Sequence, residues 1–410
     1  MGSRRPFFLV GMFILIDSII FPAINSLLKN FPNSIRYPID IAFWCFTAFT
    51  LFYFLFTVLN QDEKPHPIRR YIFSSILLIY VSKLLLSIFI LANDILYAIT
   101  WGLGKLFSFH IGYHSLPLEV LPVVGLIIAL FLAASLIYGI LFNPYNYKFH
   151  RITIVLPNLP DEFDGIKIIQ LSDIHAGSFT KDEPLGKVVE KINAEQPDLF
   201  FFTGDLVNSH ASEFDPYVDI FKNIRAKYGQ YSITGNHDYG DYAKWKNEDE
   251  KKKNFQDLMN QHAKVNWKLL MDETVQIGSK EKIAIIGIQN WSGKRNFSRY
   301  GDLEIAYPGS KGAAVKLLLS HDPSHWDTEV LKDYKDIDIS FAGHTHGMQF
   351  GFEFGKIRWS PVQWVYKEWA GLYKKGHQYL YVNRGFGFIG YPGRVGILPE
   401  VAVITLRKHN

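Results

Sequence analysis

Long apolar runs fill the first part of the chain and become short after Asn143. Four of these runs supply roughly the 20 apolar residues that cross the hydrocarbon core of a membrane. We expect a membrane-spanning helix in each of them: Pro6–Leu28, Ile39–Leu59, Tyr71–Ala92 and Leu118–Phe142. The first run is too long for a typical signal-peptide core and lacks a clear small-residue cleavage site. We therefore interpret it as an uncleaved anchor.

Basic residues near the ends of these runs indicate an orientation. Most lie at the start of the chain, between the second and third runs, and after the fourth: Arg4, Arg5, Lys64, Arg69, Arg70, Lys148 and Arg151. Fewer lie on the opposite side: Lys29, Arg36 and Lys105. Because Lys and Arg are enriched in cytoplasmic loops, we expect both chain ends in the cytoplasm. Leu96–Pro117 is then expected to be an aromatic-rich loop at the opposite interface.

Three charged residues fall inside or at the edge of the runs. Asp17, Lys83 and Glu119 each mark a functional-site hypothesis, because charge within a membrane is rarely kept without a role. The alternative, which we favour, places Glu119 at an interface and lets Asp17 and Lys83 snorkel or pair within the bundle. Cys45 is the only cysteine, so a disulfide framework and a cysteine-based zinc site are excluded. Its apolar surroundings predict a buried side chain.

From Phe149 onward the chain alternates short apolar runs with polar, helix-compatible stretches. Eight runs predict buried strands: Ile166–Leu171, Leu199–Phe202, Tyr231–Thr234, Ile283–Ile288, Val315–Leu319, Ile337–Phe341, Tyr379–Val382 and Val401–Leu406. Lys181–Glu195 and Pro216–Lys227 predict helices between them. This alternation is typical of an α/β layered domain. We expect a four-helix transmembrane domain over residues 1–148 and the α/β domain over residues 149–410.

Five short polar motifs follow hydrophobic runs in this second domain. They are Asp173-Ile174-His175, Gly204-Asp205, Gly235-Asn236-His237-Asp238, Ser320-His321-Asp322 and Gly343-His344-Thr345-His346. Loops at strand ends commonly carry functional residues. Imidazole nitrogens and carboxylate oxygens without thiolates suit Mn, Fe or Zn. Two such ions sharing a carboxylate can activate water for attack on a phosphorus ester.

The order of these motifs resembles the calcineurin-like metallophosphoesterase superfamily, over about Gly165 to Leu406. The resemblance implies a four-layer α/β/β/α sandwich with a dinuclear metal centre at the strand ends. It implies that one metal is held by Asp173, His175, Asp205 and His346. The other would be held by Asp205, Asn236, His321 and His344, with Asp205 bridging. Members use Mn, Fe, Zn or sometimes Mg, and we favour Mn.

His237 is our candidate general acid. It follows the predicted ligand Asn236, so it can face the substrate while Asn236 faces the metal. We expect Asp238 to orient the His237 ring; a turn or helix cap is the alternative for Asp238. Asn208 is either a close neighbour of the centre or a turn residue. The histidines outside the motifs are expected to be solvated or hydrogen-bonded: His210, His262, His325 and His377.

The C-terminal motifs are similar to those of a bacterial membrane-associated branch, which includes enzymes resembling UDP-2,3-diacylglucosamine pyrophosphatases. The motifs are Gly343–Gln349, Gly371-Leu372-Tyr373, Asn383-Arg384-Gly385, Pro392–Gly396 and Pro399-Glu400. Met348 stands where that branch more usually has Gly. Arg384 and Arg394 could bind phosphate as planar forks, and ion pairing is the alternative. The stretch Ile357–Tyr373 mixes Trp and Tyr with basic residues, which suits either the headgroup level of a membrane or core packing.

These features favour a membrane-anchored phosphohydrolase with two divalent metals. We expect a metal-bridging water to attack a phosphoester or pyrophosphate bond, most simply in a lipid-linked substrate, at the cytoplasmic side of a bacterial inner membrane. The net charge of +4 is too small to indicate nucleic acid as a partner. One alternative is a phosphodiesterase for soluble substrates that is merely located at the membrane. A second is a non-catalytic scaffold, against which the intact set of ligands argues.

Overall fold

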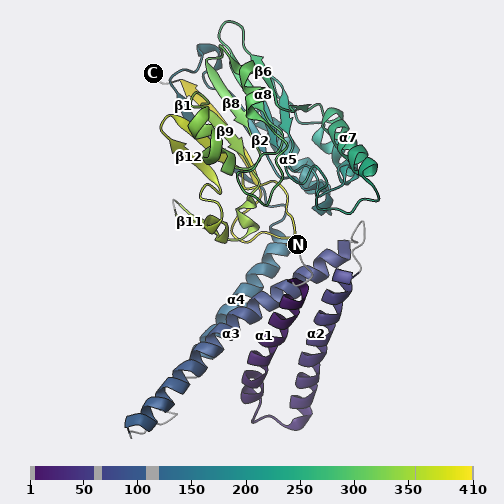
Figure 1. Ribbon diagram of the computed structural model, residues 1–410, viewed down its shortest axis with the longest axis vertical. Coiled ribbons are helices and arrows are strands. Elements are labelled where there is room, and N and C mark those ends of the chain that lie inside the picture. Colours follow the sequence, from purple (N-terminus) through teal and green to yellow (C-terminus); the bar gives the residue numbers. More distant parts are fainter. Residues whose placement is uncertain (1–4, 60–66, 108–119, 356, 409–410) are drawn as a thin grey trace. The chain divides into compact units, whose positions relative to one another are not determined.

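The computed structural model describes residues 5–59, 67–107, 120–355 and 357–408 (Figure 1). The chain divides into two compact units, Met1–Tyr138 and Gly139–Asn410. Four helices in the described residues are long and apolar enough to cross a membrane: α1 (Arg5–Leu27), α2 (Asn33–Leu59), α3 (Pro67–Phe107) and α4 (Val120–Phe142). The four predicted apolar helices are thus confirmed. The last turn of α4, from Gly139, belongs to the second unit.

Two details of the first unit differ from expectation. Helix α3 continues to Phe107, so the first half of the predicted loop Leu96–Pro117 is helical; no proline interrupts it, and the backbone hydrogen bonds can propagate. The rest of that loop, and Glu119, lie outside the described residues. Cys45 is exposed on α2 rather than buried, on a helix face where Ile41, Phe49 and Phe52 are also exposed.

A buried polar cluster joins three helices of the first unit. The carboxylate of Asp17 is fully buried. It accepts hydrogen bonds from Thr47 Oγ1 at 2.6 Å and Tyr80 OH at 2.7 Å, and pairs with Lys83 Nζ at 2.7 Å. The Lys83 ammonium also lies 4.5 Å from the ring centroid of Phe43. Asp17 and Lys83 therefore pair within the bundle, which was the interpretation we favoured.

We expect Lys83→Met to destabilise the first unit by about 3–5 kcal/mol, because the substitution leaves the buried Asp17 carboxylate without its cation. Thermal unfolding of the full-length protein in detergent would measure this. Lys29→Met, at an exposed position, is the matched control. The double variant Asp17→Asn/Lys83→Met should regain part of the loss. Equal melting temperatures for Lys83→Met and Lys29→Met would show that the pair contributes nothing.

The second unit contains two six-stranded sheets. The first has the order β1 (Lys148–Leu156), β14 (Glu400–Lys408), β2 (Lys167–Leu171), β3 (Leu199–Thr203), β4 (Gln230–Ile233) and β5 (Lys268–Leu269). The second has the order β12 (Gly371–Lys375), β13 (Gln378–Val382), β9 (Ile339–Ala342), β8 (Val315–Leu319), β7 (Ile283–Gly287) and β6 (Glu273–Ile277). All eight predicted strands are present. A separate hairpin pairs β10 (Phe352–Phe354) with β11 (Ile357–Trp359).

Strand β3 illustrates how the layers arise. Successive side chains of a strand point to opposite faces of the sheet. Phe201 packs in the core between the two sheets, together with residues of β7, β8 and β9. Phe200 and Phe202 pack on the other face, in the core shared with α5 (Glu183–Ala194) and α7 (Glu248–Lys264). Helix α8 (Leu303–Ala306) and the turn before α9 (Leu331–Asp333) cover the second sheet.

This arrangement is the predicted α/β/β/α sandwich. One predicted helix is much shorter than expected: of Pro216–Lys227, only α6 (Val218–Phe221) forms. The side chain of Asn223 donates to the carbonyl of Asp219 at 2.6 Å. Such local side-chain bonds compete with the helical backbone pattern, and here they end the helix after one turn.

Candidate metal centre

The predicted ligands come from five loops that follow parallel strands. Strands β2, β3 and β4 run parallel in the first sheet, and β9, β8 and β7 run parallel in the second. Ligands of open α/β sheets gather at the carboxyl ends of such strands. The side chains that follow these ends are Asp173 and His175 after β2, Asp205 after β3, Asn236 after β4, His321 after β8, and His344 and His346 after β9.

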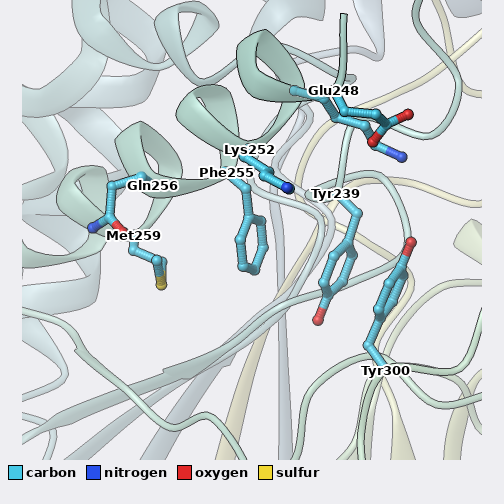
Figure 2. A pocket seen from close by; sticks show the side chains of 8 residues that line it. Tyr239, Glu248, Lys252, Phe255, Gln256, Met259 and Tyr300 are labelled. Carbon is cyan, nitrogen blue, oxygen red and sulfur yellow. The ribbon is translucent and has the colours of Figure 1, made fainter.

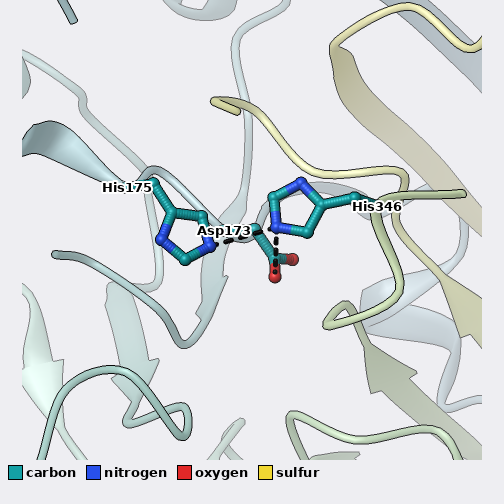
Figure 3. Close-up of side chains that lie close together, drawn as sticks. All are labelled: Asp173, His175 and His346. Carbon is teal, nitrogen blue, oxygen red and sulfur yellow. Dashed lines mark hydrogen bonds and ion pairs between the residues drawn. The ribbon is translucent and has the colours of Figure 1, made fainter. Parts of the chain in front are cut away.

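Asp173, His175 and His346 form the first cluster (Figure 3). The Nε2 atom of His346 lies 3.2 Å from Asp173 Oδ1 and 3.0 Å from His175 Nε2. All three side chains are buried. Two imidazole nitrogens and a carboxylate oxygen that converge in this way can share one cation.

Asp205, His321 and His344 form the second cluster. The Nε2 atom of His321 lies 3.2 Å from Asp205 Oδ2 and 3.3 Å from His344 Nδ1. Asn236 belongs to the neighbouring loop, where its Nδ2 donates to the hydroxyl of Tyr242 at 3.0 Å. Its Oδ1 is buried and makes no hydrogen bond. A buried acceptor without a donor is costly, and a metal ion would satisfy it.

Asp205 stands between the two clusters. Its Oδ2 atom, 3.2 Å from His321 Nε2, also lies 3.5 Å from His175 Nε2 in the first cluster. Its Oδ1 accepts the backbone N–H of His237 at 2.8 Å, which fixes the carboxylate. One carboxylate therefore faces both groups, in agreement with a shared ligand.

The electrostatics of the clusters fit divalent cations. Burial opposes ionisation of Asp205. The positive charge of His321, and of the other histidines near Asp205, nevertheless holds the pKa of this carboxyl well below its usual range. Burial likewise lowers the pKa of His321, yet Asp205 and Asp173 outweigh it and raise that pKa to about 10. The buried carboxylates thus require positive charge at this place. The oxygen and nitrogen donors suit Mn, Fe or Zn without selecting one.

Backbone strain concentrates at the same residues. Among the described non-glycine residues, ten have positive φ, and five of these are candidate ligands: Asp173 at 55°, His175 at 48°, Asp205 at 60°, His344 at 71° and His346 at 51°. Each left-handed residue of this kind costs about 1–3 kcal/mol and persists only where surrounding structure enforces it. Gly235 adds a steric requirement, because a Cβ there would lie 2.2 Å from Asp205 Oδ1.

Outer hydrogen bonds set the orientation of the imidazole rings. His321 Nδ1 lies 2.7 Å from the carbonyl of Thr203, so this nitrogen donates and leaves Nε2 free. His344 Nε2 lies 2.9 Å from the hydroxyl of Tyr366, which donates to Asp322 Oδ2 at 3.2 Å. Such partners hold metal-binding histidines in place. The sequence did not indicate that Tyr366 contacts a metal ligand. For Asp322, the only indication was its position next to His321 in the motif.

His237 lies beside the clusters rather than in them. Its half-buried ring meets that of His175 edge-on, with 4.9 Å between centroids. Its Nδ1 lies 2.8 Å from the carbonyl of Asn208, so Nδ1 donates and Nε2 remains for a substrate. Asn208 is thus a neighbour of the centre, acting through its backbone.

The role predicted for Asp238 is wrong. Its carboxylate accepts backbone N–H groups of Asp205 at 2.9 Å, Leu206 at 2.8 Å and Gly235 at 2.8 Å, and does not orient His237. The buried N–H groups of these loops need an acceptor, and Asp238 supplies it. It therefore ties the loop that carries Asp205 to the loop that carries Asn236.

The substrate-binding roles predicted for Arg384 and Arg394 are also wrong. Arg384 pairs with Glu353 at 2.6 Å and with Glu400 at 2.7 Å. Arg394 is fully buried and donates to backbone carbonyls, including those of Arg384 at 2.8 Å and Gly385 at 3.0 Å. Burial lowers its pKa to about 10. Buried guanidinium groups must be paired, so both arginines support the loops and neither is free for phosphate.

Three of the four histidines named outside the motifs fall into two kinds. His325 lies 2.9 Å from Ser320 Oγ, and His377 lies close to the carbonyl of Lys335, so both are hydrogen-bonded as expected. His262 is buried against Trp267 with neither ring nitrogen bonded, contrary to expectation. Burial lowers its pKa to about 3, which keeps this core imidazole neutral.

A cavity of about 250 Å³ lies beside the Asn236 loop (Figure 2). Tyr239 stacks on Tyr300, with 3.6 Å between centroids, and on Phe255 of α7, with 4.7 Å. Glu248, Lys251 and Lys252 complete its polar side. None of the candidate ligands lines this cavity. We therefore interpret the aromatic stack as the contact that packs α7 against the Asn236 loop.

Two family models match the chain. One, described as Calcineurin-like phosphoesterase, matches residues 166–348. The other, described as Probable Calcineurin-like phosphoesterase, transmembrane domain, matches residues 3–144. With the two ligand clusters, these matches define the chain as a metal-dependent phosphoester hydrolase. It belongs to the calcineurin-like metallophosphoesterases and carries their four-helix transmembrane domain.

Relatives with similar sequences come from bacteria and animals. The chain is 29% identical to the "Uncharacterized metallophosphoesterase YkuE" of Bacillus subtilis (strain 168), over 67% of this chain and 90% of the relative. It is 28% identical to the "Uncharacterized metallophosphoesterase Cj0846" of Campylobacter jejuni, over 72% of each chain. It is also 28% identical to the "Transmembrane protein with metallophosphoesterase domain" of Danio rerio, over 69% of this chain and 62% of that relative.

Proposed function

We propose that this enzyme cleaves a phosphoester or pyrophosphate bond in a lipid-linked substrate at the membrane surface. The observation that supports this proposal is the position of Arg394. Its backbone N–H donates to the carbonyl of Gly139 at 3.2 Å, in the last turn of the candidate span α4. Its Nη2 atom lies 3.3 Å from Nδ1 of the candidate ligand His346. A single arginine therefore connects the end of an apolar helix to the metal centre.

Exposed apolar side chains beside the centre support the same substrate class. Met348, two residues after His346, is 58% exposed, and Val365, next to Tyr366, is 59% exposed. Met348 has a φ of 54°, a conformation that favours Gly and costs other residues about 1–2 kcal/mol. An apolar side chain in this position can contact an acyl chain, whose burial contributes ~0.8 kcal/mol per CH₂.

The roles of the residues follow from the geometry. Two divalent ions, when bound, supply an activated water and neutralise charge on the phosphoryl oxygens. The two clusters and Asn236 would hold the ions, and Asp205 would be shared. His237, held by its Nδ1–H, would donate a proton from Nε2 to the leaving oxygen when both ring nitrogens carry a proton, and would be left neutral. Manganese remains our preferred metal.

The basic residues at the span ends lead us to propose a location as well. The second unit would face the cytoplasm at a bacterial inner membrane, where Lys and Arg are enriched. A single cysteine placed at Ile305, an exposed position, in a Cys45→Ser background should react with impermeant reagents only in opened cells. Labelling of that cysteine in intact cells would show that the second unit faces the outside instead.

The substrate class can be tested with the full-length enzyme in lipid nanodiscs. Phosphodiesters that share a headgroup and differ in acyl length should show kcat/KM rising with length. Met348→Ser should reduce this rise, whereas Ile305→Ser, at an exposed site elsewhere on the unit, should not. A kcat/KM independent of acyl length would favour a soluble substrate. No turnover of any substrate by protein with two metals bound would favour the scaffold.

A further inference from the structure

Exposed large apolar side chains of the second unit gather on one segment. Of the ten such residues after α4 in the part of the chain that the structure describes, six lie between residues 348 and 365. We call these six the apolar tip: Met348, Phe352, Phe354, Ile357, Trp364 and Val365. Phe354 is 82% exposed and Trp364 is 75% exposed. Single exposed apolar residues are ordinary, but a contiguous group marks an interaction surface.

The hairpin at the centre of the tip has its polar side chains turned inward. Phe352 and Phe354 flank Glu353 on β10, and Glu353 pairs with the buried Arg384 at 2.6 Å. On β11, Arg358 donates to the carbonyl of Ala370, while Ile357 is exposed. Because side chains alternate along a strand, each strand presents its apolar residues outward. A hairpin facing water would show the opposite pattern.

Ring contacts hold the tip in one shape. Phe352 stacks on Trp359, with 5.9 Å between centroids and 20° between ring planes. Trp359 meets Trp364 edge-on at 6.0 Å, which joins the hairpin to the turn Pro361–Trp364. Strands β10 and β11 pair only with each other among the described strands. The tip is therefore a rigid apolar projection, and its strands do not belong to either of the two large sheets.

The base of the hairpin is bonded next to the end of a membrane span. Val395 donates its N–H to the carbonyl of Gln349 at 2.8 Å and accepts the N–H of Gly351 at 2.9 Å. The preceding residue, Arg394, donates its N–H to Gly139 of α4. Consecutive residues thus hold the hairpin and the last turn of an apolar helix. The hairpin therefore lies within a few residues of a helix end that is expected to reach the membrane surface.

We propose that the apolar tip inserts into the lipid surface as a second membrane contact of the catalytic unit. The tip offers Trp and Phe side chains, of which Trp is enriched at the headgroup level of membranes. An inserted tip would hold Met348, and with it the loop that carries His344 and His346, close to the bilayer. This contact goes beyond the proposed function, because it holds equally for a lipid-linked or a soluble substrate.

The test uses the full-length protein in a Cys45→Ser background, with one new cysteine carrying an environment-sensitive fluorophore. Ile357→Cys reports on the tip, and Ile305→Cys on α8 is the control. The two isoleucines are matched at 65% and 66% exposure, and Figure 1 shows α8 away from β11 within the unit. Both proteins are reconstituted in phosphatidylethanolamine–phosphatidylglycerol vesicles, with or without lipids that carry a bromine or nitroxide quencher.

We expect the Ile357→Cys probe to emit at shorter wavelength than the control and to be quenched several-fold more by the labelled lipids. Aqueous iodide should quench the control more strongly. Equal iodide quenching at both sites would overturn the proposal. So would a probe shielded from iodide yet unaffected by lipid quenchers, because a protein surface, such as a second copy of the chain, would then cover the tip.

A second pair of variants separates this result from the proposed function. Phe354→Ser should weaken lipid quenching of a probe at Ile357, and Ile305→Ser should leave it unchanged. Both variants should hydrolyse a soluble nitrophenyl phosphodiester at the wild-type rate, since neither residue touches the metal centre. Unchanged lipid quenching in Phe354→Ser would contradict insertion of the hairpin, whatever substrate the enzyme uses.

Discussion

Asp205→Asn is expected to reduce turnover more than any other single ligand substitution. The Oδ2 atom of Asp205 lies 3.2 Å from His321 Nε2 and 3.5 Å from His175 Nε2, so one carboxylate serves both clusters. The amide keeps an oxygen but loses the negative charge that both metals share. Changes in the outer partners of metal ligands typically cost 10–100-fold. Loss of a shared ligand should therefore exceed about 100-fold.

Metal content and turnover, measured on the same preparation, would test this expectation. Asp322→Asn is the matched control, because that carboxylate reaches His344 through the hydroxyl of Tyr366. The control should affect one metal at most, whereas Asp205→Asn should lower the occupancy of both. Two metals per chain with a near-native rate in Asp205→Asn would exclude the shared position.

The sequence predicted the parts of the fold that depend on local pattern. Each apolar run long enough for a membrane became a helix, and each short run before a polar motif became a strand that ends there. Leu199–Phe202 followed by Asp205 is an example, because hydrophobic burial fixes the strand and its end fixes the place of the carboxylate. Parallel strands then bring such ends together without further information.

The failures concern partners that are distant along the chain. Arg384 has the charge of a phosphate ligand, but Glu353 and Glu400, 31 and 16 residues away, already pair with it. Asp238 lies next to His237 in sequence, yet its acceptor atoms serve the backbone of another loop. Sequence shows which groups a residue carries. It does not show which of those groups the fold has already used.

Tyr366 is a residue whose contact with the centre the sequence did not predict. It lay within an aromatic stretch for which lipid contact and core packing were equally open. The structure divides the stretch: Tyr366 and Trp369 are buried near the centre, whereas Trp364 is exposed. No pattern within the stretch indicated this division. On the buried side, the hydroxyl of Tyr366 bonds to His344, which lies 22 residues away along the chain.

His237→Ala is expected to leave both metals bound and to slow turnover by roughly 10²–10⁴-fold, the usual contribution of a general acid. The ring lies outside both clusters, and the Asn208 carbonyl holds its Nδ1 at 2.8 Å. The substitution therefore removes the proton donor without removing a residue of either cluster. The loss should be small for a nitrophenolate leaving group, which needs no proton, and large for an alkoxide.

Two further variants distinguish proton donation from positioning. Tyr242→Phe keeps the ring that packs 4.5 Å from His237 but removes the hydroxyl that accepts from Asn236. Asp238→Asn weakens the acceptor for four loop N–H groups and should lower the thermal stability of the unit. Both should slow good and poor leaving groups alike, because neither residue holds the transferable proton. If His237→Ala also slows the two leaving groups equally, then His237 only positions the substrate and the leaving oxygen takes its proton from water.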